Sequence, residues 1–131
     1  MKTLVFIFLL FSTLQAEIFL VGSQACTLQT LSKVEVKQLF MKKIKTIDTQ
    51  NIEVIDTTNK QLYKTFLRTF LHKTPQKMKV YWARMLFSGR KIPPKKLSFK
   101  EIQQHNNTQT CTITYTDNLQ EMKNFKEIKF Q

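Results

Sequence analysis

The sequence predicts an α/β fold, in which helices flank a small central sheet. Three apolar or β-branched segments, at residues 17–23, 51–58 and 110–116, have the length and composition of strands. Segments with helical periodicity separate them, and strands that alternate with helices are typical of a sheet covered by helices. The chain has only 2 Gly and 3 Pro, fewer than a barrel or sandwich rich in tight turns usually needs.

The first sixteen residues, MKTLVFIFLLFSTLQA, have the order of a secretory signal peptide: a positive start, an apolar run and a small residue, Ala16. A membrane anchor is the alternative, but a spanning helix needs roughly 20 apolar residues, and Gln15 and Glu17 interrupt this run early. We therefore expect export to the periplasm and no membrane span after cleavage. Residues 17–131 are long enough for one domain with a single core.

Capping residues mark the start of each predicted helix. Ser or Thr followed three residues later by Glu or Gln forms a capping box, and this spacing occurs at Ser32–Glu35, Thr58–Gln61 and Ser98–Glu101. A fourth start has Thr74 as its N-cap and Pro75 in its first turn, the positions that these residues prefer.

Apolar residues at helical spacing follow these starts. After Thr74 they are Met78, Tyr81, Trp82, Met85 and Leu86, whereas the lysines lie off this stripe. We therefore expect the aromatic side chains of TPQKMKVYWARMLFSGRKIPPKK to face the core and the lysines to face water. Gly89 and the two prolines that follow it end this helix.

The carboxy-terminal tail, residues 118–131, is predicted to add an edge strand. Phe125, Ile128 and Phe130 supply its apolar positions, and the lysines between them suit an exposed edge.

The net charge is +12 and becomes +11 when residues 1–16 are removed, because they contain one lysine and no acidic residue. Such a chain attracts anions, anionic lipid or nucleic acid. Many of the lysines are dispersed at helical spacing, however, as on a solvated face. We therefore do not expect a nucleic-acid partner; a contiguous basic patch on one face would favour nucleic acid or lipid instead.

Two cysteines, Cys26 and Cys111, lie near the two ends of the predicted domain. Export allows a disulfide between them, and a bridge across so long a loop stabilises a fold by roughly 3–5 kcal/mol. Two buried free thiols are the alternative. His72 and His105 have no partner at metal-ligand spacing, so we expect no metal and no cofactor.

Motifs of known catalytic sites are absent from the sequence. It has no Gly-rich phosphate loop and no nucleophile elbow. Asp48, Glu53 and Asp56 lie near a predicted strand, where capping and surface pairing are the expected roles. We therefore expect the protein not to be an enzyme.

The segment VIDTTNKQLYK contains the one predicted binding site. A strand ends near Ile55 and a helix begins at Thr58, and the N–H groups and dipole of a helix start favour an anion. Thr57, Thr58 and Asn59 add hydroxyl and amide donors, and Lys60 adds positive charge. Ligands tend to bind at strand ends in open α/β sheets, although a plain helix cap is the alternative.

Three segments resemble the small periplasmic proteins related to phosphate ABC-transporter substrate-binding proteins. They are LSKVEVKQLF at residues 31–40, the strand and helix of IEVIDTTNKQLYKTFLRTFLHKTPQKMK, and YWARMLFSGRKIPP at residues 81–94. The last is similar to the family pattern YW-x-R-x-x-FSG-x-x-x-PP, which is long and ungapped. The resemblance spans about residues 17–117, so the tail 118–131 lies outside it.

The resemblance implies a reduced type-2 periplasmic-binding-protein-like domain, a periplasmic location and phosphate as the family's ligand. In the family a serine-rich, arginine-containing turn holds the oxyanion. The matching turn here is DTTNKQ, in which Thr57 and Thr58 take the place of serines and Lys60 is a point charge in place of the arginine. The family's GAIGY strand is TCTITY here, at residues 110–115, without either glycine.

Two functions follow as expectations. The first is a periplasmic, non-enzymatic solute-binding module that binds phosphate or another small oxyanion at Thr57, Thr58, Asn59 and Lys60. The second is a ligand-free structural or partner-interaction protein of the cell envelope, with an envelope or transporter protein as its partner. The missing arginine and glycines favour the second function.

Overall fold

A seven-stranded mixed sheet forms the centre of the structure. The computed structural model describes residues 17–105 and 109–131, so the predicted signal peptide at 1–16 lies outside the described residues. Within them the strand order is β2-β7-β1-β6-β4-β3, and β5 also pairs with β4. The strands are β1 (Phe19–Ser23), β2 (Thr30–Leu31), β3 (Thr46–Ile47), β4 (Gln50–Thr57), β5 (Lys95–Leu97), β6 (Cys111–Thr116) and β7 (Phe125–Phe130).

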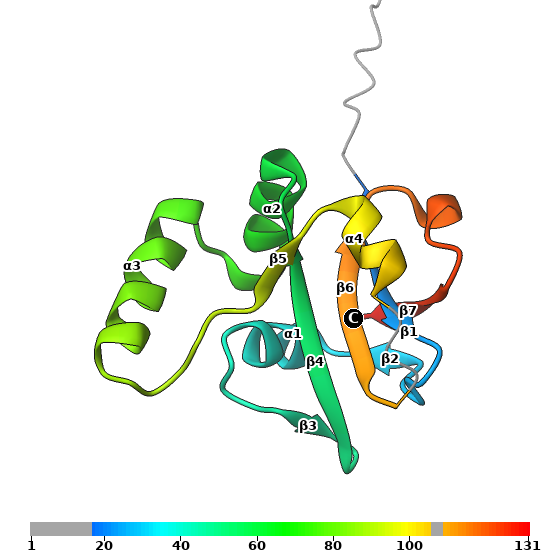
Figure 1. Cartoon of the computed structure of the whole chain (residues 1–131), viewed down its shortest axis with the longest axis horizontal. Helices are drawn as coiled ribbons and strands as arrows, with labels where there is room; N and C mark the ends of the chain where they lie inside the picture. The colour runs from blue at the N-terminus through cyan, green and yellow to red at the C-terminus, as the bar shows by residue number, and fades with distance from the viewer. Residues whose placement is uncertain (1–16, 106–108) are drawn as a thin grey trace, which may run out of the picture.

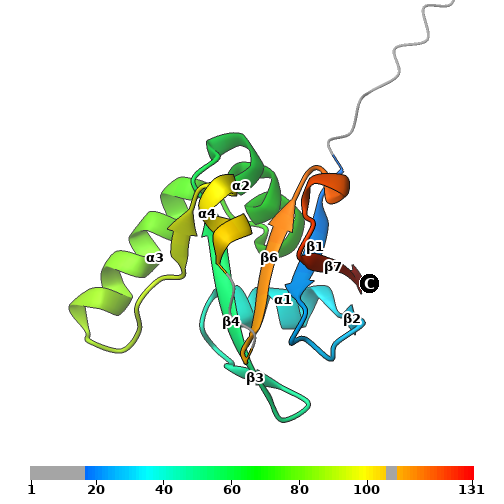
Figure 2. The same cartoon turned by 45° about the vertical axis from the view of Figure 1, so that its right-hand side comes forward.

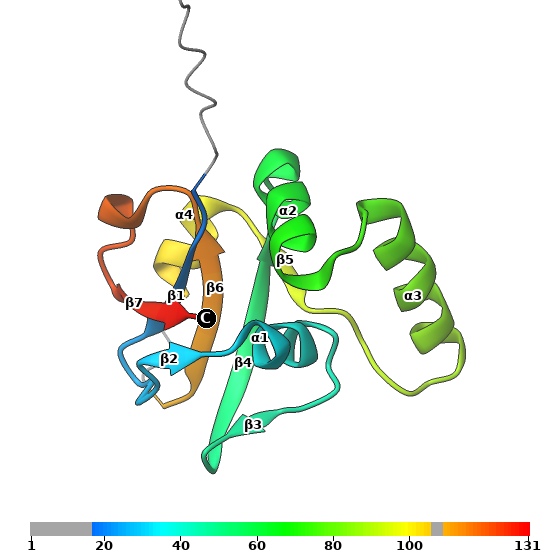
Figure 3. The same ribbon diagram turned by 180° about the vertical axis from the view of Figure 1, so that it is seen from behind.

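Four α-helices accompany the sheet in the described residues: α1 (Lys33–Phe40), α2 (Lys60–Phe66), α3 (Pro75–Phe87) and α4 (Phe99–Gln104). A π-helical turn, η1 (Leu67–Leu71), extends α2, and a 3₁₀ turn, η2 (Leu119–Glu121), precedes β7. Helices α1 and α2 cover one face of the sheet, and α4 lies on the other (Figures 1 and 3). The predicted α/β class, with a small sheet flanked by helices, is confirmed.

Alternate residues of each central strand pack into two separate cores, one on each face of the sheet. Leu20 and Val54 point into the larger core with α1 and α2, whereas their neighbours Val21 and Ile55 pack against Ile102 of α4. This is the period-2 alternation of a strand that is buried on both faces. At the centre of the larger core, the Phe66 and Tyr115 rings stack with centroids 3.9 Å apart.

Strand β6 is buried along its whole length, including its polar positions. Thr112, Thr114 and Thr116 point to the face that α4 and η2 cover, and hydrogen bonds satisfy their hydroxyl groups. The Thr114 hydroxyl, for example, donates to the Ile55 carbonyl at 2.8 Å. A β-branched residue with an internal hydrogen bond is therefore tolerated in this core.

Helix α3 stands apart from the sheet at one end of the molecule (Figures 1 and 2). Its buried residues Met78 and Trp82 attach it to the larger core, and the Tyr81 hydroxyl donates to the Met41 carbonyl at 3.0 Å. Thr74 caps the helix as predicted, and Gly89 adopts a left-handed conformation (φ 66°) just beyond its end. The predicted apolar stripe is wrong at Leu86, which is 54% exposed because α3 extends beyond the core.

Two further predictions need correction. The N-cap of α2 is Asn59 rather than Thr58, because the Asn59 side chain accepts from the Gln61 and Leu62 N–H groups. The Thr58 N–H group, which the predicted capping box would use, donates instead to Leu97 of β5 at 3.0 Å. The tail does form a strand, β7, but not at the sheet edge, since β1 pairs with one side of it and β2 with the other. The two-residue β2 was too short to be predicted from periodicity.

Candidate functional site

The predicted binding turn lies where β4 ends and α2 begins, and its backbone donors are paired within the protein. The Asn59 N–H group donates to the Thr57 hydroxyl at 3.1 Å, and Thr58 donates to β5. The Asn59 side chain accepts from the N–H groups of Gln61 and Leu62, both at 3.1 Å. An anion at this turn would have to displace these protein acceptors.

The four predicted site residues face two different cavities. Thr57, Thr58 and Asn59 line a cavity of about 370 Å³, which Asp117 and Glu121 also line. These two carboxylates oppose the binding of an anion there. Lys60 lines a separate and larger cavity of about 740 Å³ between α2, α3 and the segment that leads into β5. The structure therefore does not bring the four residues together around one ligand.

We call the larger cavity the lysine cleft, after Lys60, Lys64, Lys79 and Lys96. Lys60 and Lys64 are four residues apart on α2 and so share one face of that helix. Tyr63, Trp82, Leu86 and two prolines, Pro93 and Pro94, supply most of the apolar lining. A concave apolar surface with a few converging charges is the usual form of a small-molecule site.

Residues of α3 reach the lysine cleft by helical spacing. Lys79, Trp82, Ala83 and Leu86 follow at i, i+3, i+4 and i+7 and form one face of the helix. Trp82 belongs both to this face and to the core-facing stripe, which explains why it is buried yet borders the cleft.

Asp56 is the one carboxylate among the described residues that line the lysine cleft. It is 6% exposed and accepts a hydrogen bond from the Tyr115 hydroxyl at 2.8 Å. Burial raises the pKa of Asp56 from 3.8 to about 6, although the hydrogen bond from Tyr115 and the charges of Lys96 and Lys42 lower it. The surface pairing predicted for Asp56 is therefore wrong.

Strand pairing places Lys96 beside this buried carboxylate. In the parallel pair of β4 and β5, Asp56 is the partner of Lys96. The Lys96 ammonium lies 4.1 Å from the centroid of the Tyr63 ring, a cation–π contact. Burial, together with the charge of Asp56, raises the pKa of Tyr63 to about 12. The cleft therefore contains a neutral phenol at neutral pH, with the Lys96 ammonium over its ring.

Asp56 and the cleft face of α3 were not predicted as parts of a binding site. Asp56 is an acidic residue directly after the apolar pair Val54 and Ile55 and before two β-branched threonines, and this position inside a strand was a signal that it is buried. The cleft itself had no local signal, because α2, α3 and the segment before β5 meet only in the folded chain.

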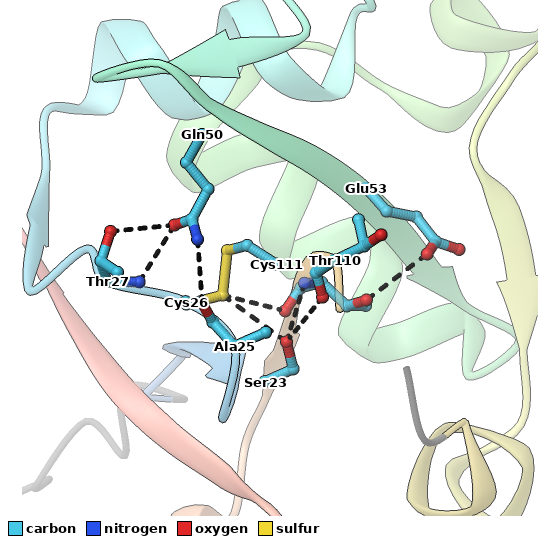
Figure 4. The surroundings of a disulfide bond; sticks show 9 residues. Ser23, Ala25, Cys26, Thr27, Gln50, Glu53, Thr110 and Cys111 are labelled. Carbon is cyan, nitrogen blue, oxygen red and sulfur yellow. Dashed lines mark hydrogen bonds between the residues drawn. A yellow bond between two sulfur atoms is a disulfide. The ribbon is translucent and has the colours of Figure 1, made fainter. Parts of the chain in front are cut away.

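The predicted disulfide between Cys26 and Cys111 is confirmed (Figure 4). It joins the loop after β1 to the first residue of β6, with 4.4 Å between the two Cα atoms. Around it, the Ser23 hydroxyl accepts from the Thr112 N–H group at 2.9 Å, and the Gln50 amide donates to the Ala25 carbonyl at 2.8 Å. A disulfide is consistent with an oxidising, extracytoplasmic location.

The residues that the structure describes offer neither a group of metal ligands nor a helix that could span a membrane. They contain no group of three His, Cys, Asp or Glu side chains placed to hold a metal ion. None of the helices in residues 17–105 and 109–131 has the length and apolar character needed to cross a membrane.

Comparison with protein-family models found no match, and comparison with curated proteins found no significant match.

Proposed function

We propose that the protein is a non-enzymatic binding module of the periplasm, a reduced periplasmic-binding-protein-like domain that binds a small organic anion. The observation that carries this proposal is the lysine cleft, in which four lysines surround an apolar lining of about the volume of a small-molecule site. The disulfide supports an oxidising compartment, and the resemblance of the Tyr81–Pro94 segment to the substrate-binding-protein family supports the domain type.

The chemistry of the cleft favours an anion with an apolar body over a bare oxyanion. Phosphate alone would contact lysines but would leave the Trp82 and Tyr63 surfaces in water. An aryl phosphate or aryl carboxylate would match both the charge and the lining. Inorganic phosphate, the ligand implied by the resemblance, stays in the proposal as the alternative ligand, with Lys60 as the positive charge of the predicted site.

The position of Trp82 makes this proposal directly measurable. The chain has 1 Trp, which borders the cleft, so its fluorescence is a local reporter of binding there. We expect phenyl phosphate to change the fluorescence at lower concentration than phosphate or sulfate, and neutral phenol to have a much weaker effect. Calorimetric titration with the same compounds provides the affinities.

Paired variants locate the ligand. Lys64→Gln with Lys79→Gln removes two cleft charges and is expected to weaken phenyl phosphate binding about fivefold. The control, Lys123→Gln with Lys126→Gln, loses the same charge outside the cleft and should bind as the parent does. If Asn59→Gly alters phosphate binding and the two cleft substitutions do not, phosphate binds at the start of α2 rather than in the lysine cleft. If folded protein gives no heat and no fluorescence change at millimolar ligand, the proposal is refuted.

A second candidate function has its own supporting observation. The N–H donors at Thr58, Asn59, Gln61 and Leu62 already have protein acceptors, as expected for a structural helix cap. We propose on this basis a ligand-free envelope protein that acts through an envelope or transporter partner. An empty cleft in the titrations, together with a partner that crosslinks to the exported protein, would favour this function over the first.

A further inference from the structure

The net positive charge of the chain comes from one continuous segment, residues 57–100. Residues 57–100 contain 12 of the 21 Lys and Arg residues and none of the 9 Asp and Glu residues. The remaining residues therefore contain 9 of each sign and have no net charge. Residues 57–100 include α2, α3 and β5; Figure 1 shows α3 at one end of the molecule and α2 and β5 next to it, near the end of β4. None of these twelve cations forms an ion pair with a carboxylate of the described residues.

The far end of α3 has a group of exposed apolar side chains, which we call the apolar tip: Leu86, Phe87 and Ile92. Their exposed fractions are 54%, 96% and 71%. Gly89 ends the helix at this point, and the two prolines after Ile92 prevent the chain from folding back as a helix. Figures 1 and 3 show that this end of α3 lies at the periphery, away from the sheet.

Cations surround the apolar tip. Arg90 and Lys91 lie in the same turn as Ile92, and they line a groove of about 570 Å³ together with Lys42 and Lys45 from the segment after α1. No carboxylate is among the described residues of this groove. Arg84 lies one turn before the tip on α3 and is exposed. The surface therefore combines large apolar side chains in water with unneutralised positive charge.

This combination selects among possible partners. A second copy of the chain would bring cations against cations, which costs free energy. Nucleic acid matches the charge, but Phe87 is the one residue of the tip with a ring to stack on bases, and Leu86 and Ile92 would gain no such contact. An anionic phospholipid surface matches both properties, since its headgroups attract Lys and Arg while its interface accepts Phe, Leu and Ile.

We infer that the apolar tip docks on an anionic phospholipid membrane surface. Phe87 and Ile92 enter the interface between headgroups and acyl chains, and Arg84, Arg90 and Lys91 contact the headgroup phosphates. The protein lies on the membrane without spanning it, and the sheet and the disulfide remain in the aqueous phase. This inference does not depend on a ligand in the lysine cleft.

Co-sedimentation with vesicles tests the inference. The full chain is produced by export and its amino terminus is determined by mass spectrometry, because an uncleaved apolar segment at residues 1–16 would itself bind lipid. We expect binding to vesicles of phosphatidylcholine with phosphatidylglycerol and at least tenfold weaker binding to phosphatidylcholine alone. Added salt should weaken binding to the anionic vesicles.

Two variants separate the apolar and charged contributions. Phe87→Ser with Ile92→Ser should weaken binding to anionic vesicles about tenfold or more, and Val34→Ser with Phe99→Ser is the control with exposed apolar residues elsewhere. Arg90→Gln with Lys91→Gln should also weaken binding about tenfold or more. Its control is Lys123→Gln with Lys126→Gln, which removes the same charge from the η2–β7 region.

Several outcomes would overturn the inference. Equal binding to neutral and anionic vesicles would do so, as would unchanged binding by Phe87→Ser with Ile92→Ser. Tight binding of a duplex oligonucleotide that depends on Arg90 and Lys91 but not on Phe87 would assign the surface to nucleic acid. Concentration-dependent dimerisation that Phe87→Ser with Ile92→Ser abolishes would assign it to a second copy of the chain.

Discussion

Asp56 shows how one residue can differ from what its side-chain type predicts. Its carboxylate lies at the buried end of β4, between the Tyr115 hydroxyl and the lysine cleft. The hydrogen bond from Tyr115 favours the charged form, but burial has the larger effect and the pKa rises to about 6. A buried carboxylate with a perturbed pKa at the edge of a cavity is typical of a functional site.

The raised pKa makes Asp56 destabilising at neutral pH. The native state holds its proton more tightly than the unfolded chain, so the stabilisation present below about pH 4 is lost as the pH rises through about 6. A shift from 3.8 to about 6 corresponds to about 3 kcal/mol. We expect Asp56→Asn, which stays neutral, to gain up to about this amount relative to the parent between pH 4 and pH 7.5.

Urea unfolding at both pH values measures this difference. Asp117→Asn, which removes the same charge from an exposed position, is the control and should show little change with pH. An Asp56→Asn variant whose stability relative to the parent is the same at pH 4 and pH 7.5 would contradict the assignment. Any effect of the amide in Asp56→Asn that does not depend on pH is the same at both pH values, so it cancels when the two stability differences are subtracted.

At the scale of elements, short hydrogen-bonded contacts decide where helices begin. Ser32 and Ser98 form the predicted capping boxes with Glu35 and Glu101, and in each box the serine N–H group donates to the glutamate carboxylate. At α2 the pairing of Thr58 with β5 moves the cap by one residue to Asn59. A capping pattern in the sequence is therefore reliable only where no neighbouring strand uses the same backbone group.

Alanine substitution distinguishes the two possible caps of α2. Asn59→Ala removes the acceptor of two N–H groups and should lower the free energy of unfolding by about 1 kcal/mol. Thr58→Ala changes an exposed side chain and should alter it by less than about 0.5 kcal/mol. Denaturant unfolding of the two variants measures both changes. A larger loss of unfolding free energy for Thr58→Ala would show that Thr58 is the N-cap, as the sequence predicted.

At the scale of the whole molecule, the disulfide joins the loop after β1 to the start of β6. Cys26 and Cys111 are 85 residues apart and buried, and they enclose most of the chain between them. Gly22 makes this approach possible, because a Cβ atom there would lie 2.9 Å from the Cys26 sulfur and 2.8 Å from the Ile128 side chain. Glycine at this position is therefore required by packing rather than by a turn.

The long loop makes the disulfide a large contribution to stability. Cys26→Ala with Cys111→Ala should lower the free energy of unfolding by roughly 3–5 kcal/mol, because the unfolded chain regains the freedom that the bridge removes. Thermal and urea unfolding measure the loss, and a thiol count on denatured, unreduced parent protein checks the bridge. Two free thiols in that count, or an unchanged stability in the variant, would contradict it.

The central elements could be predicted from local pattern because their patterns are long. The segments at 17–23, 51–58 and 110–116 became β1, β4 and β6, and the helix from Thr74 has its cap and its left-handed end where expected. Strands β2, β3 and β5 have two or three residues each. They form only because a neighbouring strand supplies their hydrogen bonds, and so periodicity could not reveal them.

The sequence by itself determined the α/β class and the disulfide partners, since the periodicity of strands and helices and the presence of two cysteines can be read along the chain. Only the tertiary structure decided that Thr57 and Lys60 face different cavities, that Asp56 is buried, and that Leu86 and Phe87 lie in water. The reason is that a cavity or an exposed surface depends on which distant segments pack beside a residue, and packing between distant segments leaves no local pattern.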